Sequence, residues 1–418
     1  MADSGIIGAL DLGEGGFKVL AARGTGASLA VEGFGVADAR GFARGRVTDI
    51  NAAAEAVASA VRQAEVMAGC SLDGRLVCSV GGDHLGNEIK KGHVKIQGGA
   101  VNRADIDLAI DTLQAFPIPA GRSILHVLEQ EFFIDGKGKI RNPLGMNGQL
   151  LEVEALVVTA ESNVIANLDA CLAKANVRPL RYMSAALAAG FATTTKDERA
   201  MGAVALDWGC GTCDYVVFKD EYAQRCAAVP CGGIDIDRDI AKIFTITLAA
   251  ARQVKERIGS AEQVPVDSDA SVEVKDADGV TTKPIEPHVL SMAIAPRVDE
   301  MLESLRAALP AELNKDALPA GAVVAGGMAQ LAGLAAVATS ELSLKARVGR
   351  PQYAGAHAED VATSEFATCF GLLQLWSGQE QGDQDLPASG LLRWLRGVFG
   401  GGSSDQPPSP APNQEQQP

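Results

Sequence analysis

The sequence predicts an α/β protein made of two related halves, and three observations support this. The stretches 9–20 and 205–218 both read as an apolar strand, a glycine turn opened by an aspartate, and a second apolar strand. Asp11 matches Asp207 and Gly13 matches Gly209, a constant offset of 196 residues. In the first half, strands are followed by a segment with helical spacing, which is typical of α/β folds.

Length and charge limit the possible functions. A chain of 418 residues is too long for one core, so two domains or several subdomains are expected. Acidic residues outnumber basic ones by 52 to 37, and the net charge of −15 repels a nucleic-acid backbone. We therefore expect no nucleic-acid partner.

The N-terminal stretch has no basic segment followed by a long apolar one, and no uncharged apolar run is long enough to span a bilayer. The body of the protein is thus expected in the cytoplasm, where its eight cysteines stay reduced. The spacing Cys210-x2-Cys213 and Cys226-x4-Cys231 is compatible with a four-thiolate zinc site. Their places in a glycine turn and around strand ends favour ordinary buried or turn thiols. No sequence pattern supports triad hydrolysis.

The first half begins with apolar runs at 6–11 and 17–22, which predict a β-hairpin. A helix is expected over 51–68, capped by Asn51, and a strand over 75–82. The segment 83–160 reads as an inserted α+β subdomain, with one helix capped by Asn102 and several strand-like runs. The expected divisions are the domain 1 core at 1–82 and 161–198, interrupted by the inserted subdomain at 83–160.

The second half opens with the repeated hairpin. A helix follows at 249–261, then strands around the Asp278-Gly279 turn, a long amphipathic helix at 288–309, and a strand leading through Gly326-Gly327 into a helix. The expected divisions are the domain 2 core at 199–235 and 291–350, its small subdomain at 236–290, a return to domain 1 at 351–376, a linker at 377–388, an amphipathic helix at 389–400 and a disordered tail at 401–418.

The glycine turns predict a phosphate site. Glycine allows bare backbone N–H groups to approach phosphate oxygens, and the aspartates facing the same space can hold Mg²⁺ through water. Two such hairpins, one from each half, would clamp a phosphate from both sides. The Gly326-Gly327 turn, third in order, suits close packing against an adenine base.

The order of these motifs resembles that of the actin and 70-kDa heat-shock chaperone superfamily, whose two related domains close over ATP. Five further stretches are similar to FtsA, the family of bacterial division actins that tether FtsZ filaments to the membrane. They are "LHVLEQEFFID", "IRNPLGMNG", "VPCGGIDIDRDIA", "HVLSMAIAPRVDEML" and "GRPQYAGAHAEDVATSEFATCFGLL". The resemblance runs from about Gly5 to Trp376. It implies an actin-like two-domain ATPase fold, with 83–160 replacing the usual actin insertion.

The resemblance also assigns residues. Asp11 and Asp207 are the aspartates expected to hold Mg²⁺ through water, and Asp207 is the candidate catalytic residue. The implied ATP-binding residues comprise the first phosphate loop (Asp11, Gly13, Gly15, Lys18), the second (Asp207, Gly209, Gly211, Thr212, Asp214), the connecting turn (Gly232, Gly233), Lys255 beside the ribose, and the base pocket (Gly326, Gly327, Met328).

Three positions depart from the family pattern. Glu14 stands where the family usually carries Ser or Thr, so that a carboxylate faces a phosphate and repels it. Cys210 replaces a loop glycine, and Arg252 replaces a glutamate near the ribose hydroxyls. ATP binding is therefore expected, while hydrolysis is not assumed.

A C-terminal helix is expected to lie on the membrane. At 100° per residue, its apolar side chains fall within one arc of about 160°, with the arginines opposite. These residues are Leu391, Leu392, Arg393, Trp394, Leu395, Arg396, Val398 and Phe399.

The resemblance implies a peripheral protein on the cytoplasmic face of an anionic membrane at the division site, with FtsZ and other division proteins as partners. It places the FtsZ C-terminal peptide near 236–290, where Arg238, Lys242, Arg252, Lys255 and Arg257 would attract an acidic segment or form a solvated face. The inserted subdomain is expected to mediate self-association into filaments. The alternatives are a PilM-like pilus-assembly actin homologue and a sugar kinase-like phosphotransferase.

Overall fold

We analysed a computed structural model that describes residues 5–24, 28–114, 117–266, 271–277, 279–310 and 313–381. The membrane helix expected at 389–400 and the tail at 401–418 lie outside the described residues. The last described helix, α11 (Ala367–Gln381), continues into the segment 377–388 that was expected to be a linker. Within the described ranges, no helix combines the length and apolar character needed to span a bilayer.

The first half contains a five-stranded sheet in the order β11-β6-β1-β2-β3. The expected hairpin is confirmed: its two strands pair antiparallel, with Asp11 opposite Lys18, and β6 runs parallel to the first of them. The strands are β1 (Ile6–Gly13), β2 (Gly16–Arg23), β3 (Ala30–Ala37), β6 (Leu76–Val80) and β11 (Pro179–Ser184). A short pair, β4 (Phe42–Ala43) and β5 (Arg46–Val47), precedes the first helix.

The second half repeats this sheet in the order β14-β13-β12-β17-β18. Its hairpin places Asp207 opposite Asp214, and its inner strand again runs parallel to a later strand. The strands are β12 (Ala203–Trp208), β13 (Cys213–Lys219), β14 (Tyr222–Val229), β17 (Gly321–Ala325) and β18 (Ala346–Val348). The predicted relation between the halves is confirmed at the level of strand order.

Helix α1 (Ile50–Ala68) covers the first sheet, close to its expected position. Its cap is Asp49, and not Asn51 as expected: the Asp49 carboxylate accepts the backbone N–H groups of Asn51 at 2.9 Å and Ala52 at 3.2 Å. The helix lies so close to β3 that a Cβ at Gly35 would collide with the Ala60 carbonyl. Small residues thus let this helix approach the sheet.

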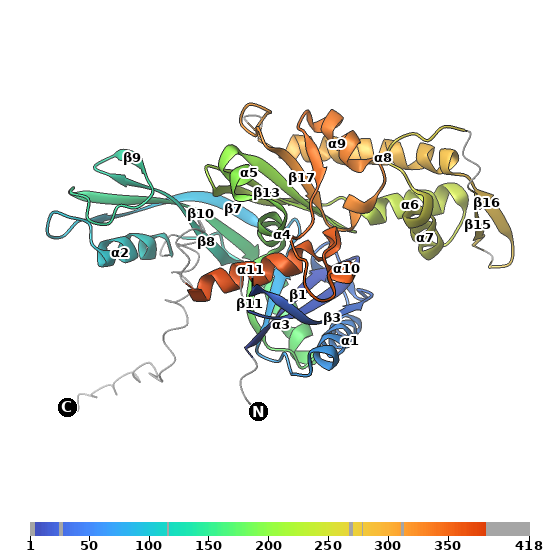
Figure 1. Ribbon diagram of the computed structural model, residues 1–418, viewed down its shortest axis with the longest axis horizontal. Helices are drawn as coiled ribbons and strands as arrows, with labels where there is room; N and C mark the ends of the chain where they lie inside the picture. The colour runs from blue at the N-terminus through green and yellow to red at the C-terminus, as the bar shows by residue number, and fades with distance from the viewer. Residues whose placement is uncertain are drawn as a thin grey trace, which may run out of the picture.

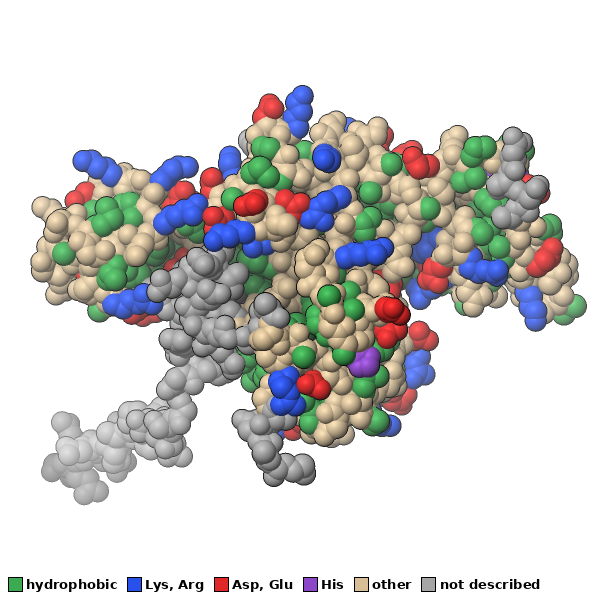
Figure 2. Space-filling view, viewed as in Figure 1, with side chains coloured by type: hydrophobic (Ala, Val, Ile, Leu, Met, Phe, Trp, Pro, Cys, Tyr) green, Lys and Arg blue, Asp and Glu red, His purple; other side chains and the backbone are tan. Residues whose placement is uncertain are grey.

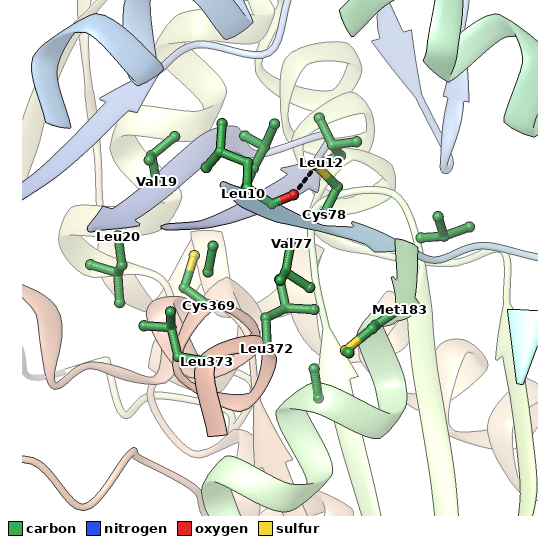
Figure 3. Packing of buried hydrophobic residues seen from close by; sticks show 14 of the residues in the cluster. Leu10, Leu12, Val19, Leu20, Val77, Cys78, Met183, Cys369, Leu372 and Leu373 are labelled. Atoms are coloured by element: carbon green, nitrogen blue, oxygen red, sulfur yellow. Dashed lines mark hydrogen bonds between the residues drawn. The ribbon is translucent and has the colours of Figure 1, made fainter. Parts of the chain in front are cut away.

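Helices α4 (Ala185–Thr193) and α11 pack on each other between the two sheets (Figure 1). A Cβ at Gly371 would collide with the Ala188 carbonyl, so glycine allows the two backbones to approach. Figure 3 shows Leu372 and Leu373 of α11 beneath Leu20 and Val77 of the first sheet. All four side chains are buried in a hydrophobic cluster that also contains Val216 and Phe218 of the second sheet, so the pair of helices joins the two halves.

The inserted subdomain projects from one end of the molecule (Figure 1) and has its own hydrophobic core. Its antiparallel sheet has the order β7-β10-β8-β9. Asn102 caps its helix as predicted, because Asn102 and Asp105 each accept the other's backbone N–H at 3.0 Å. The elements are β7 (Gly86–Lys95), α2 (Arg103–Gln114), β8 (Arg122–Ile134), β9 (Lys137–Ile140) and β10 (Leu150–Glu161).

The opposite end of the molecule holds the small subdomain of the second half (Figure 1). It comprises α6 (Gly233–Phe244), α7 (Leu248–Ile258), the predicted strand pair β15 (Val272–Lys275) and β16 (Thr282–Ile285), and the start of α8 (Pro287–Ala308). Arg297 ties α8 to α6 through Asp239, at 2.5 Å. The remaining helices are α3 (Ser162–Lys174), α5 (Lys196–Met201), η2 (Gly327–Gln330), α9 (Leu334–Leu342), α10 (Ala358–Val361) and η3 (Ser364–Phe366).

One predicted helix begins later than expected. The Gly326-Gly327 turn leads into the single 3₁₀ turn η2, and α9 starts only at Leu334. On the visible face of the molecule, Lys and Arg side chains are interspersed with Asp and Glu (Figure 2).

Candidate functional site

A cavity of about 580 Å³ lies between the two halves. Both glycine hairpins, the turn before α6 and the Gly326–Met328 segment line it. It brings together every residue predicted to bind the nucleotide except Gly232: Asp11, Gly13, Gly15, Lys18, Asp207, Gly209, Gly211, Thr212, Asp214, Gly233, Lys255, Gly326, Gly327 and Met328.

Gly232 does not line the cavity; it packs against the loop that does. Its backbone N–H donates to the Asp235 carboxylate at 3.1 Å, and a Cβ at this position would collide with the Cys210 carbonyl. Gly232 thus allows the connecting turn to pack against the second phosphate loop, while Gly233 faces the cavity.

Three aspartates line the cavity; Asp214 is buried, and Asp11 and Asp207 are half-buried. Burial raises the pKa of Asp11 against the opposing effects of Lys18 and the Ser79 hydroxyl. Burial, followed by the neighbouring Asp11 charge, raises the pKa of Asp207 to about 7, and burial raises the pKa of Asp214 to about 6. A cluster of carboxylates with raised pKa values stabilises a cation placed among them.

The hydrogen bonds of the three aspartates show which of them is used to join the two halves and which can face a cation. Asp11 accepts the Ser79 hydroxyl through Oδ1 at 2.9 Å, and Asp207 accepts the Thr368 hydroxyl through Oδ2 at 2.7 Å. Asp214 uses one oxygen for the Gly82 backbone N–H at 2.6 Å and the other for the Thr212 hydroxyl at 2.7 Å. Asp214 therefore joins the second loop to the first half, whereas Asp11 and Asp207 are better suited to a cation.

This donor set fits Mg²⁺ held mainly by water and phosphate. In the part of the chain that the structure describes, no group of three or more His, Cys, Asp or Glu side chains has the geometry of a complete metal site. Mg²⁺ commonly takes one or two carboxylates and fills its remaining positions with waters and substrate phosphates. Asp11 and Asp207 would supply those carboxylates.

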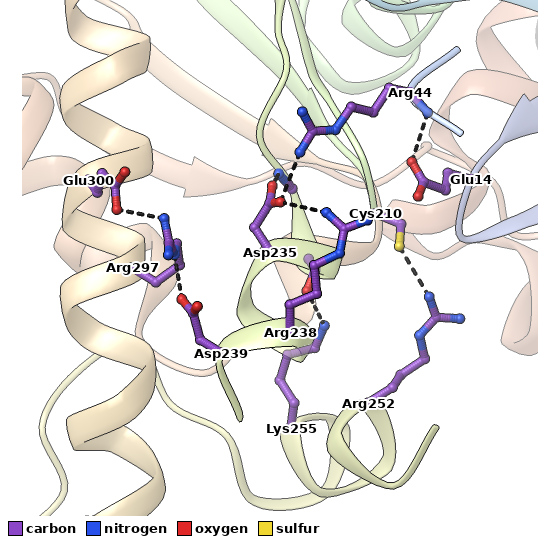
Figure 4. Close-up of polar contacts among 12 residues, drawn as sticks. Glu14, Arg44, Cys210, Asp235, Arg238, Asp239, Arg252, Lys255, Arg297 and Glu300 are labelled. Atoms are coloured by element: carbon purple, nitrogen blue, oxygen red, sulfur yellow. Dashed lines mark hydrogen bonds and ion pairs between the residues drawn. The ribbon is translucent and has the colours of Figure 1, made fainter. Parts of the chain in front are cut away.

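Helix α7 contributes the basic side chains of Arg252 and Lys255 to the cavity wall. The fully buried Asp237 of α6 pairs with Lys255 at 2.6 Å and with Arg252 at 3.4 Å. Lys255 also donates to the Gly233 carbonyl at 3.1 Å, and Arg252 donates to the Cys210 sulfur at 3.1 Å (Figure 4). Two of the residues that depart from the family pattern, Cys210 and Arg252, thus contact each other across the loop.

The cysteine spacing does not build a zinc centre among the described residues. Cys213 opens β13, Cys226 lies within β14, and both are buried; Cys210 and Cys231 are half-buried. Burial raises the pKa of Cys226 and of Cys231 to about 12, which keeps them as neutral thiols at pH 7. The interpretation as ordinary buried or turn thiols agrees with this placement.

Sequence reasoning missed several residues that build the site. Ser79 and Thr368 position the two aspartates, Gly82 anchors Asp214, and Arg44 joins the halves by pairing with Asp235 at 2.9 Å. Only the position of Ser79 near the end of an apolar strand could have indicated that it faces the loops. The other contacts join segments that are far apart in the sequence.

Two family models match this chain. "SHS2 domain inserted in FTSA" covers residues 82–159, and "Cell division protein FtsA" covers residues 204–371. The cell division protein FtsA of Neisseria meningitidis serogroup B is 31% identical, over 95% of this chain and 95% of its own length. The chain belongs to the FtsA family. FtsA of Escherichia coli K12 is 28% identical, over 88% of this chain and 91% of its own.

Solved structures show that this FtsA family member has the actin-like fold. The PilM–PilN type IV pilus biogenesis complex superposes with a TM-score of 0.59 at 17% identity, over 88% of this chain and 97% of that chain. MreB5 of Spiroplasma citri bound to ADP superposes with a TM-score of 0.51 at 12% identity, over 92% of this chain and 98% of that chain. PilM thus shares the fold, whereas the sequence relatives are FtsA proteins.

Proposed function

We propose that this chain binds ATP with Mg²⁺ between its halves and acts as a filament-forming adaptor that tethers FtsZ filaments to the cytoplasmic membrane at the division site. The cavity lined by two glycine loops and paired aspartates carries the nucleotide part of the proposal. The ADP complex of MreB5, a protein of the same fold, supports it. Membership of the cell-division family supports the adaptor part.

In this proposal the base contacts Gly326, Gly327 and Met328, and the phosphates contact the two loops. A Cβ at Gly327 would meet only the Glu365 carboxylate, at 3.4 Å, so this backbone leaves a flat, open surface for a base. Asp207 would help to hold Mg²⁺ and orient a water. Turnover is not part of the proposal, because Glu14, Cys210 and Arg252 all face the same cavity.

The FtsZ peptide is placed on the small subdomain of the second half. Arg252 and Lys255, expected to attract it, pair instead with Asp237 toward the cavity. Exposed apolar side chains on the three helices of this subdomain are better anchors, with the remaining basic groups at their rim. These anchors are Ile243, Leu248 and Met292, which are 58%, 44% and 66% exposed.

Membrane attachment and self-association complete the proposal. The amphipathic segment at 389–400 would insert Leu391, Trp394 and Phe399 into an anionic surface, and a filament would present many weak copies together. The inserted subdomain would supply contacts between copies, through exposed residues that include Leu144 and Met146.

The adaptor proposal is tested by reconstitution on anionic vesicles with FtsZ, with and without ATP and Mg²⁺. We expect the full chain to bring FtsZ to the vesicles and a chain ending before Leu391 to leave it in solution. Equal recovery of FtsZ with both chains would contradict the adaptor function. A sugar kinase-like protein would recover none.

A further inference from the structure

Glu14 places a carboxylate between the two phosphate loops. Its Oε2 accepts the Arg44 backbone N–H at 2.8 Å (Figure 4). A Cβ built at Gly211, in the second loop, would collide with the same oxygen. The first half of the molecule thus reaches the second half through an acidic side chain at the position where both loops face each other.

Arg44 follows the same path across the cleft. Its Cγ would lie 3.2 Å from a Cβ at Gly211, and its guanidinium donates to Asp235 Oδ1 at 2.9 Å (Figure 4). Arg238 binds the same Asp235 oxygen at 3.2 Å. Gly211 leaves room for Glu14 and for the stem of Arg44, so this contact depends on the absence of a side chain there.

The contact between Glu14 and Gly211 lies two residues along the second loop from Gly209, which is the loop position joined to the Gly233 turn beside Met328. Met328 Sδ lies 3.2 Å from the Cβ position of Gly233, whose N–H donates to the Gly209 carbonyl at 3.2 Å. Gly211 is two residues further along the loop and meets Glu14. A phosphate chain that starts beside Met328 and runs along this loop therefore brings its last phosphate to the Glu14 carboxylate.

We propose that Glu14 sets the length of the phosphate chain that the cleft accepts, and favours a nucleoside diphosphate over a triphosphate. This inference rests on the proposed nucleotide binding. A diphosphate ends before the carboxylate, whereas a triphosphate displaces it or lies beside it with the charge of about −2 on its terminal phosphate. Mg²⁺ on the last phosphate screens part of this repulsion, so discrimination is stronger without the metal.

The test is calorimetric titration of the full chain with ATP and with ADP, each in Mg²⁺ and in EDTA. Glu14→Gln removes the charge but keeps an acceptor for the Arg44 N–H. Glu256→Gln is the matched control, since Glu256 lines the same cavity from α7. From the charge repulsion we expect Glu14→Gln to strengthen ATP binding about tenfold in EDTA and ADP binding by less than about threefold. Glu256→Gln should change both affinities by one common factor.

The outcomes separate the two proposals. If Glu14→Gln changes ATP and ADP affinity equally while the wild type binds both, the inference about Glu14 is wrong and nucleotide binding stands. If neither the wild type nor Glu14→Gln binds any nucleotide, the proposed function is wrong as well. ATP binding gained only in Glu14→Gln supports the inference. A second variant, Glu14→Ser, is checked for folding by circular dichroism. It must bind ATP and ADP with the same relative affinities as Glu14→Gln.

Discussion

Replacing Asp207 by asparagine is expected to stabilise the protein while weakening its binding of Mg²⁺–nucleotide. Burial and the nearby Asp11 charge raise the pKa of Asp207 to about 7, against an ordinary value of 3.8. The folded protein therefore holds more protons than the unfolded chain between about pH 4 and pH 7, and its stability falls as pH rises through that window. Above pH 7 the full cost of the ionised group remains.

The magnitude follows from the same pKa. A difference between 3.8 and about 7 corresponds to at most about 4 kcal/mol of lost stability above pH 7, and to about half of that at pH 5.5. Asparagine carries no charge and keeps an oxygen for the Thr368 hydroxyl, which lies 2.7 Å from Asp207. We expect Asp207→Asn to raise the free energy of unfolding by about 1–4 kcal/mol at pH 7.5, with a smaller gain at pH 5.5.

Urea unfolding in EDTA, followed by circular dichroism at pH 5.5 and 7.5, measures this effect. Asp299→Asn, an exposed position on α8, is the control and should change little at either pH. Added ATP and Mg²⁺ should stabilise the wild type more than Asp207→Asn, since the variant lacks one cation ligand. A variant that is less stable than the wild type in EDTA at pH 7.5, or a gain that does not depend on pH, would refute the reasoning.

Three other changes have defined outcomes. Gly371→Val should lower the free energy of unfolding, measured by urea titration, by about 2 kcal/mol or more, because the new side chain collides with the Ala188 carbonyl and separates α4 from α11. An unchanged urea midpoint would contradict this packing. Ile243→Glu should weaken binding of the FtsZ C-terminal peptide, measured by fluorescence anisotropy, at least about tenfold, whereas Val66→Glu, on the exposed face of α1, should not. Equal losses of affinity in the two variants would place the peptide elsewhere. Trp394→Glu should abolish sedimentation with anionic vesicles, and full retention would show that 389–400 is not the anchor.

The sequence was most informative where the site is local. Each hairpin is contiguous, so the aspartate and glycines of one turn are held by neighbouring strands, and the 196-residue repeat revealed their partners. The prediction of the α1 cap was wrong because Asp49 and Asn51 are both good capping residues, and only the backbone conformation decides between them.

The parts that escaped prediction join distant segments. Thr368 contacts Asp207 from the helix between the sheets, and Arg44 reaches Asp235 from a short loop in the other half. The family resemblance implied that the Glu14 carboxylate would face a phosphate. It gave no sign that Glu14 lies against Gly211, because that contact joins residues from different halves of the chain.

The central claim is that a nucleotide binds between the halves, and calorimetric titration of the full chain with ATP and Mg²⁺ tests it most directly. We compare the wild type with Gly327→Leu, which fills the base pocket, and with Ala249→Leu, which adds the same side chain on the exposed part of α7. The account predicts one site in the wild type and in Ala249→Leu, and binding at least about tenfold weaker in Gly327→Leu. Equal ATP affinity in all three proteins, or no heat of binding in the wild type with either ATP or ADP at high micromolar concentration, would contradict it.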